Sequence, residues 1–301
     1  MQYRATKPTY HLNKTWEENY KLGPNFEGPY PPMPKAKEWE FLGKKLISPL
    51  GVAAGPLPNA KWLVTYLKLG YGSVIQKTVR SSAHKSHQFP NITFVKPSEK
   101  LKFDQKPLIV ERKMNNSVEN LSITNSFGNP CKEPKEWIKE GQITKKSVKS
   151  GQMFGISVYG TAEVNTTADE LVEDYALTAK MAKVAGAEFI EANLACPNVK
   201  GAENPNLYKD AEAVGKIVRA IKAKIGKTPL VLKIGYFDNY NEMKQMLKKS
   251  KGYFEAISAI NTIQKEIVDD KGKHPLPGRD TSGVCGKIIK EFALDTVKKL
   301  N

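Results

Sequence analysis

Long apolar runs, a secretory signal and paired cysteines are all missing from this chain of 301 residues. No window approaches about 18 uninterrupted apolar residues, so the sequence predicts no membrane-spanning helix. The first twenty residues have no apolar core and are not read as a secretory signal. The three cysteines, Cys131, Cys196 and Cys285, show no CxxC spacing. That argues against a disulfide framework and a metal site, and it favours a reducing cytoplasm.

Arginine is scarce, although the formal net charge is +16. Only five of the 47 basic residues are arginine, and the lysines are scattered along the chain. Proteins that bind nucleic acid rely on arginine, because its planar guanidinium pairs bidentately with phosphates and bases. The composition therefore predicts no nucleic-acid partner. It indicates either a solvated lysine surface or a surface that attracts anionic metabolites.

Three common nucleotide and hydrolase motifs are missing too. No GxGxxG follows a candidate strand, and neither a GxxxxGK[ST] loop nor a GxSxG elbow occurs. These absences remove the commonest dinucleotide, nucleoside-triphosphate and hydrolase interpretations. What is present from Leu46 onward is an alternation of short apolar runs with amphipathic stretches, which is typical of βα units.

Six short apolar runs are the candidate strands. Each has four to eight residues with few charges, as parallel strands buried on both faces require. They are Ile47–Ala54, Ser73–Thr78, Phe154–Tyr159, Glu188–Leu194, Leu230–Ile234 and Ala256–Ile260. Repeated βα units without the dinucleotide fingerprint favour an α/β fold of the (β/α)8 TIM-barrel type over a doubly wound sheet.

The helices between these strands carry end signals. Thr167 and Glu170 form a capping box, because each side chain can satisfy a free backbone amide of the other residue. Apolar residues recur at helical spacing over residues 214–225, and Gly226 follows in the position that commonly ends a helix. Further helices are expected near residues 241–249 and from Lys287 to the end.

The chain divides into an extension and one larger domain. Residues 1–45, rich in proline and aromatic residues, are expected to wrap over a core. Residues 46–301 would form the barrel domain, and the irregular, proline-containing stretch 81–150 would be a functional insertion within it. A complete barrel has eight βα units. We count six, so we expect an incomplete barrel without strands seven and eight.

Polar side chains follow several of the candidate strands. Lys77 and Lys233 end two of them, and the segment Asn193–Asn198 with its Cys196 follows a third. Asn261 and Thr262 follow the last. Active sites of barrels lie at these carboxyl ends, where lysine can stabilise negative charge and a thiol can act as a base. The small residues of Ser282–Gly286 predict a loop before the final helix that contacts a ligand through its backbone.

At this point the sequence resembles the class 1 dihydroorotate dehydrogenases. Asn193-Leu-Ala-Cys196-Pro-Asn198-Val-Lys-Gly201 is similar to their NLSCPNxxG loop, and Asn125-Ser-Phe127-Gly128 to their NSMG-type substrate loop. Asn261-Thr262 resembles a strand that ends in N-[ST], and Ser282–Lys290 resembles the GGxSGxxIKP segment. The departures from the pattern include Ala195, Ser282, Cys285 and Glu291.

The resemblance implies an FMN-dependent barrel that oxidises dihydroorotate to orotate in pyrimidine biosynthesis. It implies Cys196 as the general base and no metal. The implied substrate-binding residues are Lys77, Asn125, Phe127, Gly128, Asn193, Asn198, Asn261 and Thr262. The implied FMN-binding residues are Ala53, Ala54, Gly55, Lys77, Asn193, Lys233, Gly283 and Gly286. It also implies a cytoplasmic enzyme that forms a homodimer or has a partner subunit.

Two alternatives stay open. One is a flavin domain of the dihydropyrimidine dehydrogenase type, although the chain lacks iron–sulfur cysteine clusters. The other is a non-catalytic, FMN-free fragment or subunit, because the glycine-rich loops that hold the FMN phosphate in this family belong to strands seven and eight. The electron acceptor, whether fumarate, NAD or another oxidant, is not indicated.

Overall fold

A computed structural model describes residues 8–35, 38–104, 106–114, 117–196 and 204–300. Its centre is a sheet of parallel strands that follow one another in chain order, β3-β4-β8-β9-β10-β11. The strands are β3 (Gly51–Val52), β4 (Ser73–Val79), β8 (Met153–Val158), β9 (Phe189–Asn193), β10 (Leu230–Ile234) and β11 (Ala256–Ala259). All six predicted strands are therefore confirmed, and the sheet is a half-barrel; only β3 is much shorter than expected.

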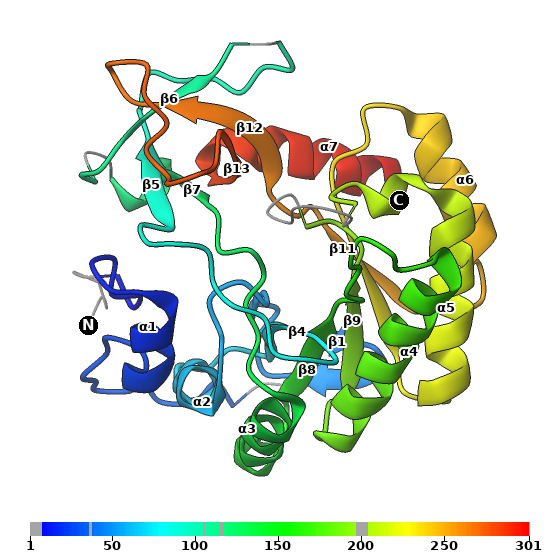
Figure 1. Cartoon of the computed structure of the whole chain (residues 1–301). Helices are drawn as coiled ribbons and strands as arrows, with labels where there is room; N and C mark the ends of the chain where they lie inside the picture. The colour runs from blue at the N-terminus through cyan, green and yellow to red at the C-terminus, as the bar shows by residue number, and fades with distance from the viewer. Residues whose placement is uncertain (1–7, 36–37, 105, 115–116, 197–203, 301) are drawn as a thin grey trace.

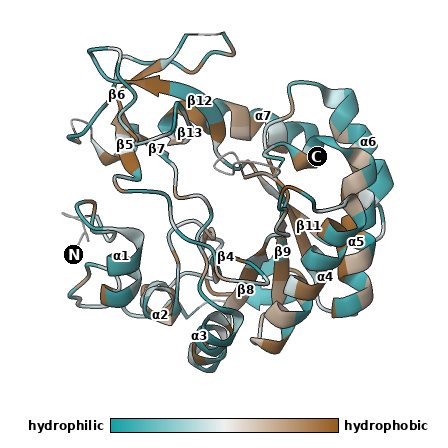
Figure 2. Ribbon diagram, in the orientation of Figure 1, coloured by the Kyte–Doolittle hydropathy of each residue, from teal (hydrophilic) through white to brown (hydrophobic). Residues whose placement is uncertain are grey.

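Helices cover the outer face of this sheet, as βα units require (Figure 1). They are α2 (Ala60–Lys68), α3 (Pro134–Ser147), α4 (Ala168–Val184), α5 (Ala211–Ile225) and α6 (Tyr240–Ser250). Thr167 and Glu170 make both bonds of the predicted capping box, and α5 ends at Gly226 as expected. Figure 2 shows that apolar residues concentrate in the strands and in the helix faces turned toward them.

A hairpin closes the amino-terminal end of the half-barrel. It consists of β1 (Trp39–Phe41) and β2 (Lys44–Leu46), which lie at the end of the predicted extension, with Leu46 one residue beyond it. The ring of Phe41 stands edge-on to Phe189, with 5.7 Å between the ring centroids. Phe189 also packs with Leu46, Met153 and the neighbouring strands in one buried apolar cluster. This end of the barrel is apolar, and the polar residues of the interior lie toward the opposite, carboxyl end.

A second, smaller sheet stands over the carboxyl end and closes on itself in the order β12-β13-β7-β5-β6. Its strands are β5 (Ile92–Val95), β6 (Leu108–Glu111), β7 (Ser122–Asn125), β12 (Ile263–Val268) and β13 (Thr281–Gly286). The prediction of a loop at Ser282–Gly286 is wrong, because this segment pairs in antiparallel register with β7 and β12. Small residues suit it because β13 is packed closely between two neighbours.

Other helical segments lie near the two ends of the described chain and in the stretch 81–150. α1 (Trp16–Leu22) lies in the extension beside α2. α3 lies within the stretch 81–150 that looked irregular in the sequence. The expected last helix is present as a short 3-10 turn, Lys287–Ile289, followed by α7 (Lys290–Leu300). None of the helices in the described ranges is both long enough and apolar enough to span a membrane.

Glu188 joins several of these elements immediately before β9. Its carboxylate lies 2.6 Å from the Lys44 ammonium of β2 and 3.0 Å from the Lys145 ammonium of α3. It also accepts a hydrogen bond from the backbone amide of Phe154 at 3.0 Å. Burial raises the pKa of this carboxyl, but these three donors lower it more, and the net pKa is below its ordinary value.

We expect Glu188→Gln to lower the free energy of unfolding at pH 7 by about 1–3 kcal/mol, because two ammonium groups lose their carboxylate. The folded-state pKa is depressed, so this stabilisation is present above the ordinary pKa of 4.5. It is lost as the pH falls through the folded-state pKa. In urea unfolding experiments from pH 7 to pH 3, the free energies of unfolding of the two proteins should therefore converge.

The matched control is Glu212→Gln, which removes the ion pair between Glu212 and Lys249. The side chain of Glu212 is 68% exposed. Its effect should be small at every pH, because solvent-exposed pairs contribute little. A difference between Glu188→Gln and the unsubstituted protein that stays constant down to pH 3 would contradict the role given to Glu188.

Candidate functional site

The carboxyl edge of the parallel sheet gathers four of the predicted site residues. Lys77 lies near the end of β4, Asn193 ends β9, and Lys233 is the next-to-last residue of β10. Asn193 and Lys233 are direct neighbours in the register of β9 and β10. The backbone amide of Asn261, two residues after β11, donates to Ile234 O at 2.8 Å. Parallel strands end at one edge, and this common edge brings the four residues into one region.

Asn193 is buried and its amide is bonded on both sides. Its Nδ2 donates to the hydroxyl of Thr78 at 3.2 Å, and its Oδ1 accepts from Asn261 Nδ2 at 3.4 Å. The backbone amide of Ala195 donates to the same Oδ1 at 3.3 Å. From α4, the Tyr175 hydroxyl donates to the Asn193 carbonyl at 2.9 Å. The side chain is thereby fixed in orientation.

Asn261 lies against Asn193 and the segment that follows it. Its Nδ2 also donates to the carbonyl oxygen of Ala195, and its Oδ1 accepts from the backbone amide of Thr262 at 3.0 Å. The predicted substrate-binding residues Asn193, Asn261 and Thr262 are therefore in one hydrogen-bonded group. Asn198, which belongs to the same predicted set, lies outside the described residues.

Lys77 and Lys233 give the site a positive side. Burial is the main cause that lowers the pKa of Lys77, and the charges of Arg80 and Lys233 lower it further. The thiols of Cys196 and Cys131 act in the opposite direction, because a thiolate favours the charged ammonium. Cys196 itself is buried. The predicted base and Lys77 thus influence each other electrostatically, so they belong to the same region of the site.

The predicted substrate loop follows β7. Asn125 donates to Cys285 Sγ at 3.9 Å, and the ring of Phe127 lies over the Lys77 ammonium at 5.8 Å from the ring centroid. Gly128 has a φ of +73°, and a Cβ there would meet His87 Nε2 at 2.4 Å. Glycine is thus required at this position by backbone geometry alone, whatever the ligand.

The remaining predicted cofactor residues lie on two elements. Ala53, Ala54 and Gly55 follow β3, the edge strand that pairs with β4, and a Cβ on Gly55 would meet open space. Gly283 is opposite Asn125 in the register of β13 and β7. At Gly286, a Cβ would approach Leu121 O to 2.4 Å. Glycine at position 286 is therefore favoured by the close packing of the backbone as well.

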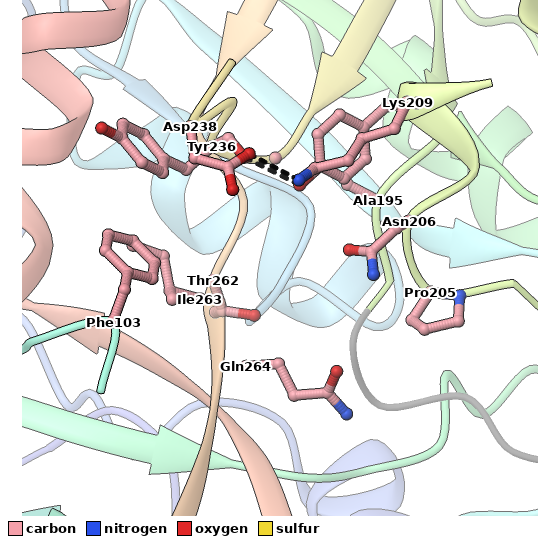
Figure 3. Close-up of a pocket in the computed structure, with 12 residues that line it drawn as sticks. Phe103, Ala195, Pro205, Asn206, Lys209, Tyr236, Asp238, Thr262, Ile263 and Gln264 are labelled. Atoms are coloured by element: carbon pink, nitrogen blue, oxygen red, sulfur yellow. Dashed lines mark hydrogen bonds and ion pairs between the residues drawn. The ribbon is translucent and has the colours of Figure 1, made fainter. Parts of the chain in front are cut away.

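A cavity of about 220 Å³ opens beside the hydrogen-bonded asparagines. It touches Ala195 and Thr262 on one side, and Figure 3 shows the amides of Asn206 and Gln264 on its walls. The ion pair between Lys209 and Asp238, 2.7 Å long, spans another wall. Of the predicted site residues, Thr262 lines this cavity, whereas Lys77, Asn193, Lys233 and Asn261 do not.

Three residues of this region were missed in the sequence. Thr78 connects Asn193 to the Ser157 hydroxyl at 3.0 Å. Glu191 is fully buried in β9, and neither carboxylate oxygen has a hydrogen-bond partner among the described residues. A glutamate in the middle of a buried strand was the available signal. Arg279 is buried, and its Nη1 donates to Ser126 O in the substrate loop. No group of metal-ligating side chains occurs within the described ranges.

Cys285 gives a chemical test of the site. Burial raises the pKa of its thiol to about 11, although Asn125 and the charge of Lys233 act to lower it. We expect Cys285 to react with iodoacetamide at pH 8 about a hundredfold more slowly than a free thiol, because only the thiolate is nucleophilic. The rate, followed by peptide mass mapping, should continue to rise tenfold per pH unit up to about pH 11.

The shape of this profile separates a raised pKa from poor access, since poor access lowers the rate at every pH. A rate that levels off near pH 8.5, the ordinary range of a free thiol, would contradict the environment described for Cys285.

Comparison with known proteins agrees with the resemblance. Residues 106–301 match the family model described as dihydroorotate dehydrogenase. A dihydroorotate dehydrogenase of Dictyostelium discoideum is 33% identical over 99% of this chain and 83% of its own length. The catalytic subunit of a dihydroorotate dehydrogenase B (NAD(+)) from Alkaliphilus oremlandii is 31% identical over 46% of this chain and 45% of that subunit.

Solved structures support the fold. The crystal structure of DHODH from Eimeria tenella in complex with ferulenol aligns with a TM-score of 0.65 at 17% identity, covering 90% of this chain and 71% of that one. At this identity the likeness shows the TIM-barrel-like α/β fold only. On the match to the family model and the relative in Dictyostelium, the chain belongs to the dihydroorotate dehydrogenase family.

Proposed function

We propose that this chain is a flavin-dependent oxidoreductase of class 1 that oxidises dihydroorotate to orotate in pyrimidine biosynthesis. The proposed reaction is supported by the membership of this chain in the dihydroorotate dehydrogenase family. The observation that connects it to particular residues is the convergence of Lys77, Asn193, Lys233 and Asn261 at one sheet edge, beside the buried thiol of Cys196. The reaction removes a proton from one ring carbon and a hydride from its neighbour, so it needs a base on one face of the ring and a hydride acceptor on the other.

FMN would supply the hydride acceptor when bound, and the residues present fit it. Burial penalises the charged form of Lys77, and a negatively charged flavin edge would offset that cost. Lys233, beside Asn193 in the neighbouring strand, would stabilise negative charge in the same region. In this proposal Lys233 would face the flavin and stabilise its reduced anion, and Lys77 would lie near both flavin and substrate. The backbones of Ala53, Ala54, Gly55, Gly283 and Gly286 would contact the flavin.

The parallel sheet has six strands in the part of the chain that the structure describes. The resemblance assigns the FMN phosphate to loops that follow a seventh and an eighth strand. Phosphate binding and an incomplete barrel therefore stay predictions, and stoichiometric bound FMN in the purified chain is the measurement that decides between a catalytic chain and an FMN-free subunit.

Cys196 is the proposed base. Its coupling to Lys77 supports this role, because a positive charge nearby favours the thiolate that must take the substrate proton. Asn193 and Asn261 now bond to each other. They would exchange this bond for the donors and acceptors of the pyrimidine ring, with Thr262, Asn125 and, outside the described residues, Asn198.

A homodimer or partner subunit and a cytoplasmic location remain predictions, and the electron acceptor is not indicated. The catalytic subunit from Alkaliphilus carries NAD(+) in its name. Reduction of NAD by this chain would require a partner that carries electrons to it.

We expect Cys196→Ala to lower the rate of orotate formation by a factor of about 10²–10⁴, the usual contribution of a general base. Bound flavin absorbance should be unchanged, because the thiol is not proposed to hold FMN. Cys196→Ser should recover part of the rate with its pH optimum shifted upward, since a hydroxyl ionises at higher pH.

Full activity of Cys196→Ala with normal flavin content would end the assignment of the base. Dihydrouracil is the comparison substrate. A purified enzyme that oxidises dihydrouracil and leaves dihydroorotate unchanged would favour the dihydropyrimidine dehydrogenase type over the function proposed here.

A further inference from the structure

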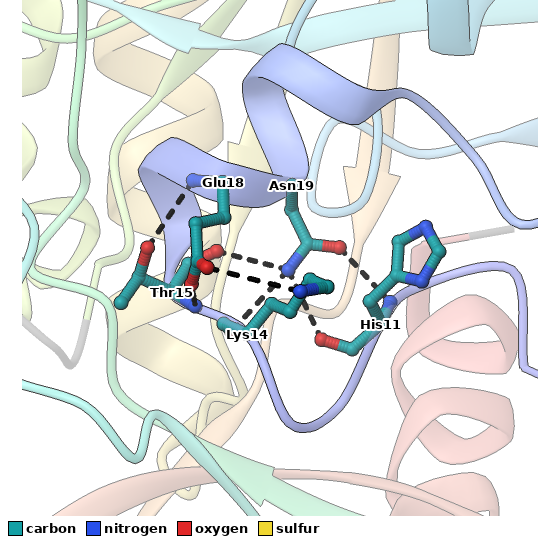
Figure 4. Close-up of polar contacts among 5 residues, drawn as sticks. All are labelled: His11, Lys14, Thr15, Glu18 and Asn19. Atoms are coloured by element: carbon teal, nitrogen blue, oxygen red, sulfur yellow. Dashed lines mark hydrogen bonds and ion pairs between the residues drawn. The ribbon is translucent and has the colours of Figure 1, made fainter.

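Hydrogen bonds within the N-terminal segment, residues 8–22, hold its loop against helix α1. The amide of Asn19, which is fully buried, donates to the carbonyl oxygens of His11 at 3.0 Å, Lys14 at 3.3 Å and Thr15 at 2.9 Å. Its Oδ1 accepts from the His11 backbone amide at 2.9 Å. Thr15 and Glu18 add a capping box at the start of α1. Figure 4 shows these bonds joining the loop to the helix.

The same segment is attached to the barrel through α2. The indole nitrogen of Trp62 donates to Asn19 O at 3.2 Å, and Asn59 Nδ2 donates to Tyr20 O at 2.7 Å. The hydroxyls of Thr9 and Tyr66 lie 2.8 Å apart. Residues 8–22 therefore have a fixed position relative to β3 and β4, the strands that α2 connects.

Tyr10 extends this fixed position to the substrate loop. Its ring centroid lies 5.8 Å from that of Trp62 and 5.9 Å from that of Phe127, where the two rings meet edge to face at 75°. Phe127 in turn lies over the Lys77 ammonium. A continuous line of contacts thus runs from the N-terminal segment to the lysine that is proposed to face flavin and substrate.

The backbone of the substrate loop is held by other residues. Ser126 O accepts from Arg279 and from Asn91 Nδ2, and Phe127 O accepts from the His87 backbone amide at 2.9 Å. What these bonds leave undetermined is the direction of the Phe127 ring. Tyr10 supplies the edge-to-face contact that determines it, a geometry that aromatic pairs prefer.

We propose that Tyr10 is a positioning residue for the reaction: its ring holds Phe127 over Lys77 and keeps water away from that ammonium. The inference rests on the proposed function for the roles of Phe127 and Lys77 in substrate binding. The hydroxyl of Tyr10 is buried without a hydrogen-bond partner among the described residues. The ring alone therefore carries the effect.

Besides one double variant, the experiment compares the unsubstituted full chain, loaded with FMN, with four single variants. They are Tyr10→Ala, Tyr10→Phe, Phe127→Ala and the control Phe26→Ala. Phe26 is an aromatic residue of the same extension whose ring contact, 5.1 Å between centroids, is with Tyr30 and not with the substrate loop. The control reports loss of aromatic packing in the extension by itself.

We expect Tyr10→Ala to raise KM for dihydroorotate about three- to tenfold with kcat changed by less than about twofold, as the loss of one aromatic pair implies. Tyr10→Phe should restore the original KM. Combining Tyr10→Ala with Phe127→Ala should add little to Phe127→Ala alone, because both changes remove the same contact. An unchanged KM in folded Tyr10→Ala, or an equal increase in Phe26→Ala, would overturn the proposal.

A second measurement does not depend on activity. Reductive methylation of Lys77, followed by peptide mass mapping, should increase several-fold in Tyr10→Ala and Phe127→Ala, but not in Tyr10→Phe or Phe26→Ala. If this pattern appears and the unsubstituted enzyme leaves dihydroorotate unchanged, the proposed function fails and the positioning role stands. If Lys77 labelling is the same in all five proteins, the positioning role fails.

Discussion

The contact between the side-chain amides of Asn193 and Asn261 is the constraint on which the site depends. Each residue continues the backbone pattern of its strand: Leu194, after Asn193, donates to Lys233 O at 3.0 Å, and Asn261 donates to Ile234 O at 2.8 Å. The loops after β9 and β11 therefore leave the sheet at one height. Polar groups of three strands, Thr78, Asn193 and Asn261, thereby meet within hydrogen-bond distance.

The barrel interior changes character along its axis. At the end beside the β1–β2 hairpin, Phe189 of β9 and Met153 of β8 belong to an apolar cluster. Glu191 and Asn193 follow Phe189 at alternate positions of β9. Alternation along a strand turns all three side chains of β9 to one face. Both side-chain oxygens of the buried Glu191 lack a hydrogen-bond partner among the described residues, and leaving a buried polar group unpaired is costly. Such a layer suits polar contact with a ligand better than packing alone.

The parallel sheet could be read from the sequence because its strands are buried on both faces and so appear as apolar runs between helical patterns. The residues at their ends followed from geometry alone. The strand Thr281–Gly286 could not be read, since its small residues carry no alternation. Helix α3 begins at Pro134 and buries only Trp137, Gly141 and Thr144, which is too little apolar periodicity to see. The contact of Tyr10 with Phe127 could not be predicted either, because it joins segments more than a hundred residues apart.

The scarcity of arginine takes on a structural meaning in this light. Two of the five arginines, Arg80 and Arg279, are buried, while 42 of the 47 basic residues are lysine. Arg279 donates to backbone carbonyls of Ser126, Gln88, Pro90 and Pro277 at once. A lysine has three donors on one atom and cannot reach four carbonyls spread around a planar group. In this lysine-rich chain, Arg279 occupies the position where one planar group donates to several carbonyls. It thereby connects the second sheet to the substrate loop over the carboxyl edge.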